Sequence, residues 1–236
     1  MKIISPEDGI QIMKESKAIT FLTGAGVSTA SGIPDYRSLS GVYQGIEAPE
    51  YLLSRSCLLR EPEKFYDFVK RLYHPNAEPN RIHLAMADME KQKEVWVVSQ
   101  NIDGLHQKAG SRNRIDFHGN LYDCWCERCK QHVSAEQYLV NDRHEGCGGQ
   151  LRPGIVLYEE GFDDQTISAA VKAVVAAELL VVVGTSFQVH PFCDLAAYAR
   201  PDAKLLVINQ TPVRLRGEYF YIETDAMNVF NKIEGK

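Results

Sequence analysis

The stretch AITFLTGAGVSTASG, residues 18–32, contains the pattern that decides the fold class. Its first part, Ala18 to Thr23, is a short apolar run rich in strand-forming residues, and the glycines Gly24 and Gly26 follow it. A glycine turn after a buried strand brings backbone N–H groups and a helix N-terminus towards a phosphate, which is the physical basis of dinucleotide binding. The stretch therefore predicts a strand, a tight turn and a helix that begins at about Val27 to Thr29.

Three later segments repeat the pattern of a continuously apolar strand that ends in small or polar residues. They are Val95 to Val98 before Ser99-Gln100-Asn101, Leu179 to Val183 before Gly184-Thr185-Ser186, and Leu205 to Ile208 before Asn209. Strands that are apolar on both faces are typical of a parallel sheet covered by helices. Helices are expected at about Pro6 to Ser16, Gln165 to Ala177 and Pro191 to Ala199. The predicted fold class is α/β, with an open doubly wound sheet whose carboxyl edge faces the ligand.

Two segments interrupt this alternation and predict a smaller lobe beside the sheet. Residues 36–75 look helical and rich in loops, and residues 121–153 hold four of the six cysteines. We expect a single domain over residues 1–236, with a larger lobe at about 1–35, 76–120 and 154–236 and a small lobe at about 36–75 and 121–153. A chain of 236 residues is long enough for a well-buried core and short for two independent domains.

Composition and charge argue against several classes of function. The formal net charge is −5 and no cluster of Lys and Arg is visible, which argues against a nucleic-acid-binding surface. The N-terminal segment lacks the apolar core of a signal peptide, and no apolar run approaches the roughly 18 residues that span a bilayer. We therefore expect a cytoplasmic protein without nucleic-acid or membrane partners, whose cysteines are reduced thiols or metal ligands. Nothing in the sequence indicates the oligomeric state.

The glycine turn alone is a weak signal for a dinucleotide. Thr29 stands where the usual spacing has glycine, and no acidic residue follows a clear second strand about 20 residues later. A tight structural turn is therefore an open alternative. The other strand ends strengthen the hypothesis, because Thr185 and Ser186 offer hydroxyls to a phosphate and Asn209 offers a side chain to a ribose, although ordinary helix caps would use the same residues.

Four longer motifs, taken together, resemble the sirtuin family. They are GAGVSTASGIPDYRS at residues 24–38, QNIDGLH at 100–106, HGN at 118–120 and GTSFQVHP at 184–191, and they span nearly the whole chain in the family's order. The resemblance implies a Rossmann-like NAD-binding lobe and a small helical and zinc-binding lobe, with acyl-lysine and NAD in a cleft between them. It also implies an NAD-dependent protein deacylase of the bacterial type that consists of the catalytic core alone.

The resemblance assigns groups of residues to the cosubstrate NAD. Residues expected at the phosphates or ribose are Ala25, Thr29, Arg37, Thr185, Ser186 and Asn209. Those expected around nicotinamide are Tyr36, Asn101, Ile102 and Asp103, and those expected near the adenine are Ala226 and Met227. The same motifs place Gly24, Gly26, Asp35, Gln100 and Gly184 among the cofactor-binding residues. The family usually has phenylalanine at the position of Tyr36.

The reaction that the resemblance implies needs a base. In the family, the acyl oxygen of a modified lysine attacks the ribose carbon that carries nicotinamide, and the acyl group then moves to ADP-ribose. This second stage requires activation of a ribose hydroxyl, and the motif points to His118. Histidine suits the role because its unperturbed pKa of about 6.5 leaves much of it neutral near pH 7. Asn101 and Asp103 would position nicotinamide and assist its departure.

The expected zinc site departs from the family pattern. Sirtuins typically have two CxxC pairs, and here Cys126 and Cys129 form the first, whereas His144 and Cys147 stand at the second. Three thiolates and one imidazole form a standard closed, structural zinc site. Cys124 is a rival fourth ligand, although its spacing from Cys126 is poor for chelation. Loss of the metal is the remaining alternative.

The expected substrates are proteins or peptides that carry acyl-lysine. The segment Val156-Leu157-Tyr158 resembles the family's substrate strand, which would pair with the peptide as an added strand. Glu159-Glu160 would then slightly favour basic residues beside the lysine. Family members that remove succinyl groups carry a tyrosine and, three residues later, an arginine, but here Val69 follows Tyr66 at that distance. Because nothing obvious would pair with an acyl carboxylate, we expect neutral acyl groups, acetyl first.

Two other functions remain open from the sequence. The same activation of NAD could deliver ADP-ribose to a protein group, as in an ADP-ribosyltransferase, although His118 favours deacylation. A non-catalytic sensor of NAD or ADP-ribose would be expected to have lost catalytic residues, yet Asn101, Asp103 and His118 are all present.

Overall fold

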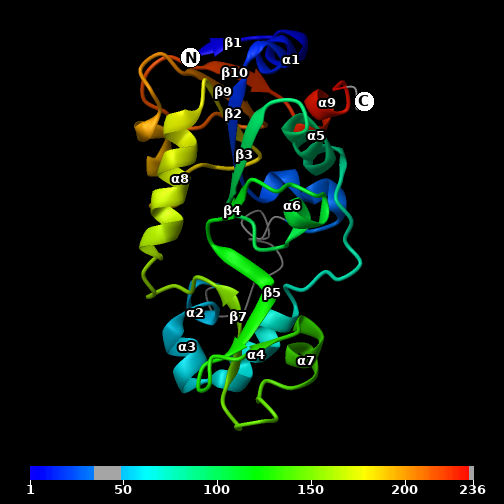
Figure 1. The fold of residues 1–236 in the computed structure, drawn as a ribbon, viewed down its shortest axis with the longest axis vertical. Coiled ribbons are helices and arrows are strands. Elements are labelled where there is room, and N and C mark those ends of the chain that lie inside the picture. Colours follow the sequence, from blue (N-terminus) through cyan, green and yellow to red (C-terminus); the bar gives the residue numbers. More distant parts are fainter. Residues whose placement is uncertain (35–48, 234–236) are drawn as a thin grey trace.

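The computed structural model of this chain describes residues 1–34 and 49–233, and the strands in those ranges form two separate sheets. A seven-stranded sheet lies at one end of the molecule and a three-stranded sheet at the other, as Figure 1 shows. The N-terminus lies at the end that holds the larger sheet, close to α1. The chain crosses between the two ends near β4 and β5.

All neighbouring strands of the larger sheet run parallel, in the order β1-β10-β9-β8-β2-β3-β4. Their bounds are β1 Lys2–Ile3, β2 Ala18–Thr23, β3 Glu94–Ser99, β4 Arg114–Asp116, β8 Leu179–Val183, β9 Lys204–Asn209 and β10 Phe220–Glu223. Thr23 at the end of β2 pairs with Ser99 of β3 on one side and with Val183 of β8 on the other. The strand order reverses at this point, and doubly wound sheets bind their ligands at the carboxyl ends beside such a reversal.

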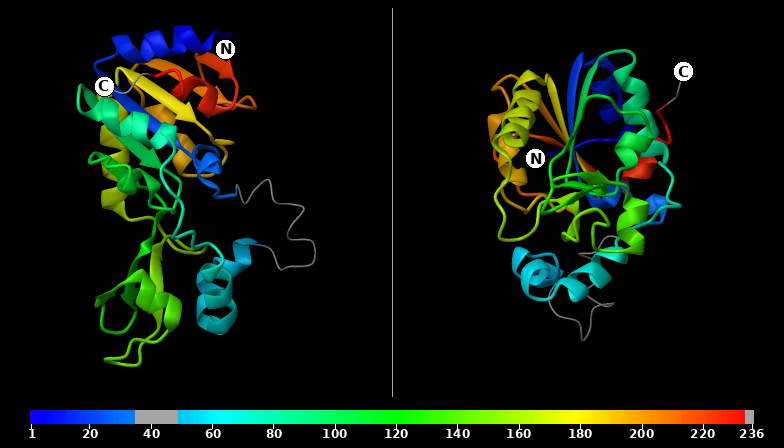
Figure 2. Two further views of the ribbon diagram at one scale, coloured as in Figure 1. Left: turned by 90° about the vertical axis from the view of Figure 1, so that its right-hand side faces the viewer. Right: turned by 60° about the horizontal axis from the view of Figure 1, so that its bottom comes forward.

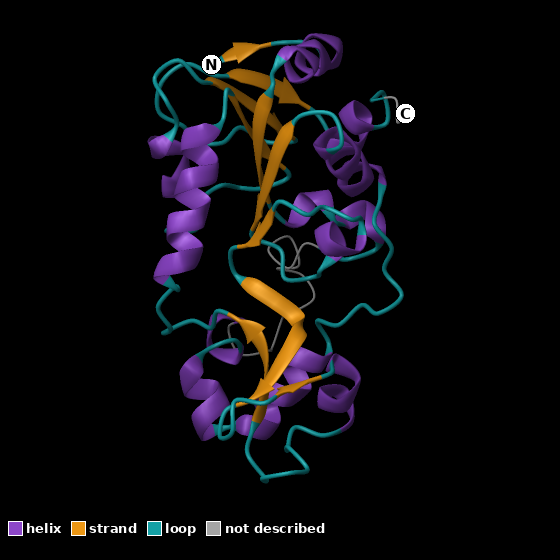
Figure 3. Cartoon of the chain, in the orientation of Figure 1, coloured by secondary structure: helices purple, strands orange, loops and turns teal. Residues whose placement is uncertain are grey.

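Helices cover both faces of the larger sheet, as Figure 3 shows. One layer is α1 Pro6–Glu15, α5 Arg81–Glu90 and α9 Ala226–Phe230, and the other is α8 Asp164–Ala176 with the 3-10 helix η3 Phe192–Tyr198. Alternate residues of β2 divide between the layers: the Phe21 ring lies 6.2 Å from that of Phe230, whereas Leu22 belongs to the same buried cluster as Val174. No helix in the described ranges is both long and apolar enough to cross a membrane.

The smaller sheet and its helices form a lobe at the other end of the molecule (Figure 2). Its elements are α2 Pro49–Leu52, α3 Arg55–Arg60, α4 Pro62–Lys70, β5 Gly119–Cys126, β6 His132–Val133, α7 Ala135–Val140 and β7 Leu151–Ile155. The strands are antiparallel, in the order β6-β5-β7. Phe65, Val69 and Tyr138 are fully buried in a cluster of this lobe. The lobe therefore has a hydrophobic core of its own.

The predicted α/β class is confirmed, and β2 and β8 run over the predicted residues. Helix α1 begins as predicted because Ser5 and Asp8 form a capping box, in which each side chain accepts a hydrogen bond from the other's backbone N–H. The helix predicted at residues 191–199 is present as η3, a 3-10 helix rather than an α-helix.

The helix predicted to begin at about Val27 to Thr29 is present only as short 3-10 helices. The chain forms two short 3-10 helices there, η1 Ala25–Val27 and η2 Thr29–Ser31. A separate short α-helix, α6, spans Leu105–Lys108 after β3. The Gly26 N–H donates to the Gly184 carbonyl oxygen at 2.8 Å, and Gly32, with a φ of 81°, ends η2. The hydrogen bond to Gly184 therefore fixes the start of this segment against the end of β8.

Candidate active site

A cavity of about 720 Å³ opens at the carboxyl edge of the larger sheet and extends to the small lobe. Its volume is typical of a small-ligand site. Residues that follow β2, β3, β8 and β9 line the sheet side: Ala25, Gly26, Ser28, Thr29, Gln100, Asn101, Ile102, Asp103, Gly184, Thr185, Ser186 and Asn209. The small-lobe side includes Leu53, Phe68, Leu72, Leu121, Ile155 and Leu157. His118, which stands between β4 and β5, also lines the cavity.

The glycines of the first motif hold the end of β2 against the end of β8. A Cβ atom at Gly26 would lie 2.8 Å from the Gly184 Cα, which is closer than real Cβ contacts. Gly184 itself has a φ of 61°, a conformation that favours glycine. A Cβ atom at Gly24 would lie 2.6 Å from the Cβ of Thr185. These glycines are therefore required for packing of the two strand ends, and this packing shapes the cavity floor.

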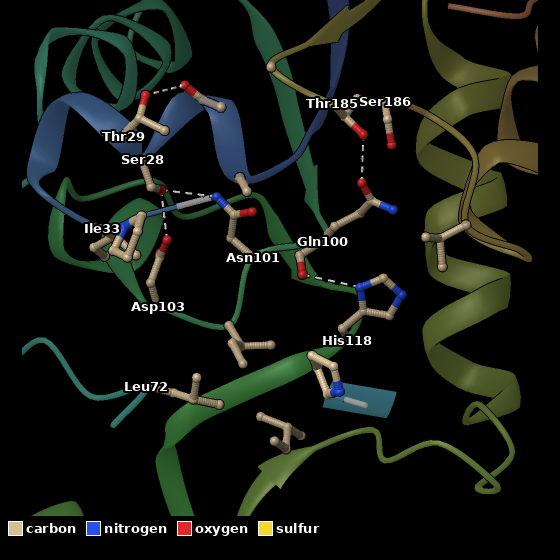
Figure 4. Close-up of a pocket in the computed structure, with 18 of the residues that line it drawn as sticks. Ser28, Thr29, Ile33, Leu72, Gln100, Asn101, Asp103, His118, Thr185 and Ser186 are labelled. Carbon is tan, nitrogen blue, oxygen red and sulfur yellow. Dashed lines mark hydrogen bonds between the residues drawn. The ribbon is translucent and has the colours of Figure 1, made fainter. Parts of the chain in front are cut away.

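Ser28 connects Asn101 and Asp103, as Figure 4 shows. The Ser28 hydroxyl accepts a hydrogen bond from Asn101 Nδ2 at 2.9 Å and donates one to Asp103 Oδ2 at 2.6 Å. Asp103 also accepts from the Leu105 backbone N–H at 2.9 Å. Burial raises the pKa of Asp103, and the hydrogen bonds from Ser28 and Leu105 partly offset that rise. The network fixes both side chains at the end of β3.

Two buried histidines lie behind this network and have structural roles. The Asn80 N–H donates to His83 Nδ1 at 3.3 Å, so the neutral ring carries its proton on Nε2, which faces Ser28 Oγ at 3.4 Å. Burial lowers the pKa of His83 to about 4. Burial also lowers the pKa of His106, whose Nε2 lies 3.2 Å from Thr23 Oγ1. Both rings therefore stay neutral near pH 7.

His118 has the orientation and the tautomer that a general base needs (Figure 4). Its Nδ1 lies 3.1 Å from the Gln100 carbonyl oxygen, which can only accept, so Nδ1 carries the proton. In the neutral ring, Nε2 is then the basic nitrogen. The rings of Phe117, Phe162 and Phe192 surround the imidazole, with centroids 5.6, 5.5 and 6.2 Å from its own. These contacts limit the rotation of the ring.

Gln100 bridges the ends of β3 and β8. Its Oε1 accepts a hydrogen bond from Thr185 Oγ1 at 2.8 Å, and Thr185 Oγ1 accepts one from the Phe187 N–H at 3.0 Å. Gln100 Nε2 is buried and has no hydrogen-bond partner in the described part of the chain. Such a donor costs free energy until it is paired. This nitrogen has almost no accessible surface, so a ligand in the cavity would reach it only after the side chain shifts. The fit to the expected cosubstrate rests instead on Thr185, Ser186 and Asn209, which line the cavity at the ends of β8 and β9.

Some residues assigned to NAD lie away from the cavity or cannot be placed. Asp35, Tyr36 and Arg37 fall outside the described residues. Gly24 and Met227 are not among the described residues that line the cavity, and Met227 packs against the core of the larger lobe. Ala226, next to Met227, does line the cavity.

The small-lobe side of the cavity is apolar and lacks a cation among its described residues. Phe68 and Leu72 line it, and none of the described lining residues is Lys or Arg. The Tyr66 hydroxyl points elsewhere, because it donates a hydrogen bond to the Tyr138 carbonyl oxygen at 2.8 Å. Val69 is fully buried in the small-lobe core. Among the described residues, this part of the cavity therefore offers no cation to a negatively charged acyl group.

The segment Val156-Leu157-Tyr158 lines the cavity directly after β7. The Val156 N–H donates to the His118 carbonyl oxygen at 2.9 Å, so this segment adjoins the histidine. Glu160 accepts from the Leu157 N–H at 3.0 Å and from the two terminal nitrogens of Arg152 at 2.6 and 2.9 Å. The Glu160 charge is therefore used to hold the segment in place, and the expected slight preference for basic residues beside the lysine stays a prediction.

Four metal-ligand side chains meet in the small lobe: Cys126, Cys129, His144 and Cys147. Their ligand atoms all lie within 4.8 Å of one another. The sulfurs of Cys129 and Cys147 lie 3.3 and 3.2 Å from His144 Nδ1, and those of Cys126 and Cys147 lie 3.5 Å apart. Zinc bonds of about 2.0–2.3 Å in a tetrahedron separate the ligand atoms by roughly 3.5–3.8 Å. The four residues thus fit a zinc ion.

Cys124 does not belong to this group. Its side chain is fully buried in the small-lobe core, where its thiol donates to the Leu121 carbonyl oxygen at 3.3 Å and lies 3.4 Å from the Tyr73 hydroxyl. Cys124 is therefore absent from the group of side chains whose ligand atoms lie within 4.8 Å of one another. His144 is therefore the fourth residue of the group. None of its four members lines the cavity, which indicates a structural metal.

Comparison with known proteins identifies the family. The model described as the Sir2 family matches residues 24–191 of this chain. The chain belongs to the Sir2 family. Among curated Sir2 relatives, the "NAD-dependent protein deacetylase" of Enterococcus faecalis is 57% identical over 233 residues, which cover 99% of this chain and 98% of that protein.

Solved structures of Sir2 proteins share the fold. The crystal structure of a Sir2 homolog in complex with NAD superimposes with a TM-score of 0.88 at 30% identity, covering 98% of this chain and 93% of that one. A Sir2 enzyme bound to a propionylated peptide gives a TM-score of 0.85 at 28% identity, covering 98% and 97%.

Two residues of this Sir2 site are not singled out by the sequence. Ser28 lies inside the first motif, so its position offers a signal, but only the structure shows that it joins Asn101 to Asp103. Phe162 stands in a loop after β7 without any motif, and the fold brings its ring to 5.5 Å from that of His118.

Proposed function

We infer that this protein is an NAD-dependent protein-lysine deacetylase, which removes acetyl or other neutral acyl groups and releases nicotinamide and O-acyl-ADP-ribose. The observation that carries this inference is the state of His118. Its Nδ1 donates to Gln100, and its basic Nε2 belongs to a cavity that also collects the predicted NAD residues. The name of the Enterococcus relative and the propionylated peptide of the structural relative support the same reaction.

Each polar side chain of the cavity has a role in this proposal. NAD supplies the ribose carbon that the acyl oxygen attacks. His118 takes a proton from a ribose hydroxyl, and Asn101 and Asp103 bind nicotinamide from the positions that Ser28 fixes. Thr185 and Ser186, with Asn209 at the end of β9, face the phosphates and ribose. Gln100 holds Thr185 in place, because its Oε1 accepts the hydrogen bond from Thr185 Oγ1.

The simplest test is turnover of an acetyl-lysine peptide with and without NAD. We expect deacetylation only with NAD, and no change of absorbance in the band of reduced nicotinamide. Deacetylation that proceeds equally well without NAD would contradict the proposal, and so would formation of reduced nicotinamide.

We also propose one structural zinc ion per chain, held by Cys126, Cys129, His144 and Cys147. The short distances between their ligand atoms support it. The ion would join the end of β5 to the loop before β7, and it would take no part in the reaction.

The chain is proposed to be one catalytic domain with two lobes, in a cytoplasmic location. The separate core of the small lobe supports the division at about residues 36–75 and 121–153, and the burial of Ile155 and Leu157 in that core extends the lobe to about residue 157. None of the six cysteines forms a disulfide, which is typical of a reducing compartment.

The enzyme is expected to prefer acetyl-lysine over succinyl-lysine by at least about tenfold in kcat/KM, a ratio that corresponds to roughly 1.4 kcal/mol. A succinyl carboxylate would lose water in an apolar cavity without gaining a cation among the described residues. Rates are to be measured by mass spectrometry on one peptide sequence. A propionyl peptide, larger but neutral, is the matched control and should react like the acetyl peptide. Faster turnover of the succinyl peptide would contradict the assignment.

Replacing Glu160 with glutamine is expected to destabilise the protein by about 2 kcal/mol at pH 7, because the buried Arg152 loses its main counter-ion while Glu127 remains 3.3 Å away. Burial opposes ionisation of Glu160, but hydrogen bonds from Arg152 and the Leu157 N–H outweigh it and lower the pKa of Glu160 below 4.5. Its stabilising effect is therefore present above the unfolded pKa and is lost as the pH falls below about 4.5. Urea unfolding as a function of pH should show a smaller acid-induced loss in the variant.

The matched control for this variant is Glu78→Gln. Glu78 pairs with Lys108 at 2.7 Å on the surface, with side chains 72% and 43% exposed. Exposed pairs contribute about 0–1 kcal/mol. Equal losses of stability in the two variants would show that the Arg152 pair has no special role.

A further inference from the structure

A second group of metal-ligand side chains lies outside the zinc module. His190, Cys193 and Asp194 stand at the start of η3, and their ligand atoms all lie within 4.8 Å of one another. Residues three and four positions apart lie on the same side of a helical turn. The Cys193 N–H donates to the Val189 carbonyl oxygen at 3.0 Å, which closes the turn.

The turn that carries this group is anchored in the core. Phe192 and Leu195, which alternate with the three ligand residues, are 0% and 2% exposed. The side chains of His190 and Asp194 are instead 74% and 56% exposed. The polar groups therefore face solvent from a backbone that is held firmly, so that an ion can reach them without unfolding of the turn.

The contacts inside the group compete for one nitrogen. Asp194 Oδ2 lies 2.7 Å and Cys193 Sγ 3.5 Å from the same His190 Nδ1. If Nδ1 carries a proton, it can donate a good hydrogen bond either to Asp194 or to Cys193, but not to both. If Nδ1 carries no proton, the Cys193 thiol can donate to it, but the Asp194 carboxylate then faces the nitrogen lone pair. A cation in place of the proton would interact favourably with all three atoms at once.

The donor set and its spacing indicate a borderline metal ion such as Zn²⁺. Imidazole nitrogen, thiolate sulfur and carboxylate oxygen are all common zinc ligands. In a tetrahedral site with bonds of about 2.0 Å to nitrogen and 2.3 Å to sulfur, these two atoms lie about 3.5 Å apart. The separation of His190 Nδ1 and Cys193 Sγ is already 3.5 Å. Only the exposed Asp194 carboxylate has to move outwards.

We propose that His190, Cys193 and Asp194 bind one Zn²⁺ ion at the rim of the cavity, as a second site that is weaker than the site in the small lobe. Three protein ligands leave the fourth position open to water or to a ligand group. Val189 and His190 line the same cavity as His118, so the ion would stand beside the entrance to the active site.

Zinc titration of the folded protein, with the small-lobe site already loaded, tests this proposal directly. Isothermal calorimetry should detect one further equivalent of Zn²⁺ per chain. Cys193→Ser and His190→Gln should each weaken this equivalent by at least about tenfold, because each removes a ligand. Co²⁺ added in place of Zn²⁺ should give a sulfur-to-cobalt charge-transfer band that Cys193→Ser abolishes. Circular dichroism and retention of the first zinc confirm that the variants are folded.

His132→Gln is the matched control. His132 is exposed and lies 3.0 Å from the Asp123 carboxylate, so it reproduces the His–Asp pair without a cysteine beside it. This variant should bind the second equivalent like the wild type. The proposal is overturned if the wild type takes up no second equivalent, or if Cys193→Ser and His190→Gln bind it with unchanged affinity.

Zn²⁺ bound at the rim of the cavity should also lower the rate of deacetylation, an expectation that rests on the proposed deacetylase activity. We expect added Zn²⁺ to inhibit deacetylation by the wild type at concentrations at least about tenfold lower than those that inhibit Cys193→Ser. Equal inhibition of the two proteins would show that zinc acts elsewhere. Absence of all activity would contradict the proposed function but leave the binding result unaffected.

Discussion

His118→Ala is expected to lower kcat/KM for deacetylation by at least about 100-fold, the usual contribution of a general base. The structure gives the reason. Because Nδ1 donates to Gln100, Nε2 is the basic nitrogen, and the alanine substitution removes this base from the cavity. The effect should fall on the stage that follows loss of nicotinamide. The rate is to be measured by the mass of an acetyl-lysine peptide under conditions of saturating NAD.

Two controls make this prediction specific. His132→Ala removes an exposed histidine of the small lobe and should leave the rate unchanged. Exchange of labelled nicotinamide into NAD in the presence of acetyl peptide should persist in His118→Ala, because that exchange does not require the base. Turnover of His118→Ala within about threefold of the wild type would show that another group serves as the base.

Cys147→Ser is expected to release the structural zinc and to destabilise the small lobe by several kcal/mol. A structural zinc ion contributes on the order of 10 kcal/mol in small zinc peptides, and Cys147 contacts both Cys126 and His144 in the ligand group. Zinc content is to be measured after dialysis against a weak chelator, which also clears any exchangeable ion. Thermal unfolding should then show a large decrease in Tm.

His144→Cys is the matched variant for the same site. It restores the four-cysteine set of the family, so it should retain one zinc per chain and nearly the wild-type Tm. Stoichiometric zinc in Cys147→Ser would contradict the assignment of the ligands, and loss of zinc from His144→Cys would show that the site requires an imidazole.

The main strands could be predicted because burial on both faces leaves a strong signal in composition. The five residues of β8, Leu179–Val183, are all buried, and so are most residues of β2. The strands β1, β4 and β10 were not predicted. They are two, three and four residues long, and β1 is exposed, so no periodic pattern can develop. Such short strands form because a neighbouring strand is already in place.

The geometry of the glycine turn depends on contacts that local sequence does not contain. Composition predicts a turn after β2, but the close packing of Gly26 on Gly184 joins residues that are far apart in the chain. The helix expected after this turn is present as two short 3-10 helices. The motifs predicted which residues lie at the cavity floor. The backbone conformation of these residues could be known only from the structure.

The zinc group shows what spacing alone leaves undecided. Cys124 and Cys126 both lie on β5, and the sequence offers each of them to the metal. Cys126 is the last residue of the strand, where it meets the loop that carries Cys147, whereas Cys124 pairs with Val133 and Pro153 inside the sheet. The position along the strand therefore distinguishes a metal ligand from a core thiol.

The most direct test of the central claim is the stoichiometry of one reaction mixture that contains the zinc-loaded protein, NAD and an acetyl-lysine peptide. Mass spectrometry would follow the peptide and the protein, and chromatography would follow nicotinamide. We predict one acetyl group lost from the peptide for each nicotinamide released, with the acetyl group recovered on ADP-ribose. Release of nicotinamide with an unchanged acetyl peptide and a gain of ADP-ribose mass on protein would contradict the account and identify an ADP-ribosyltransferase.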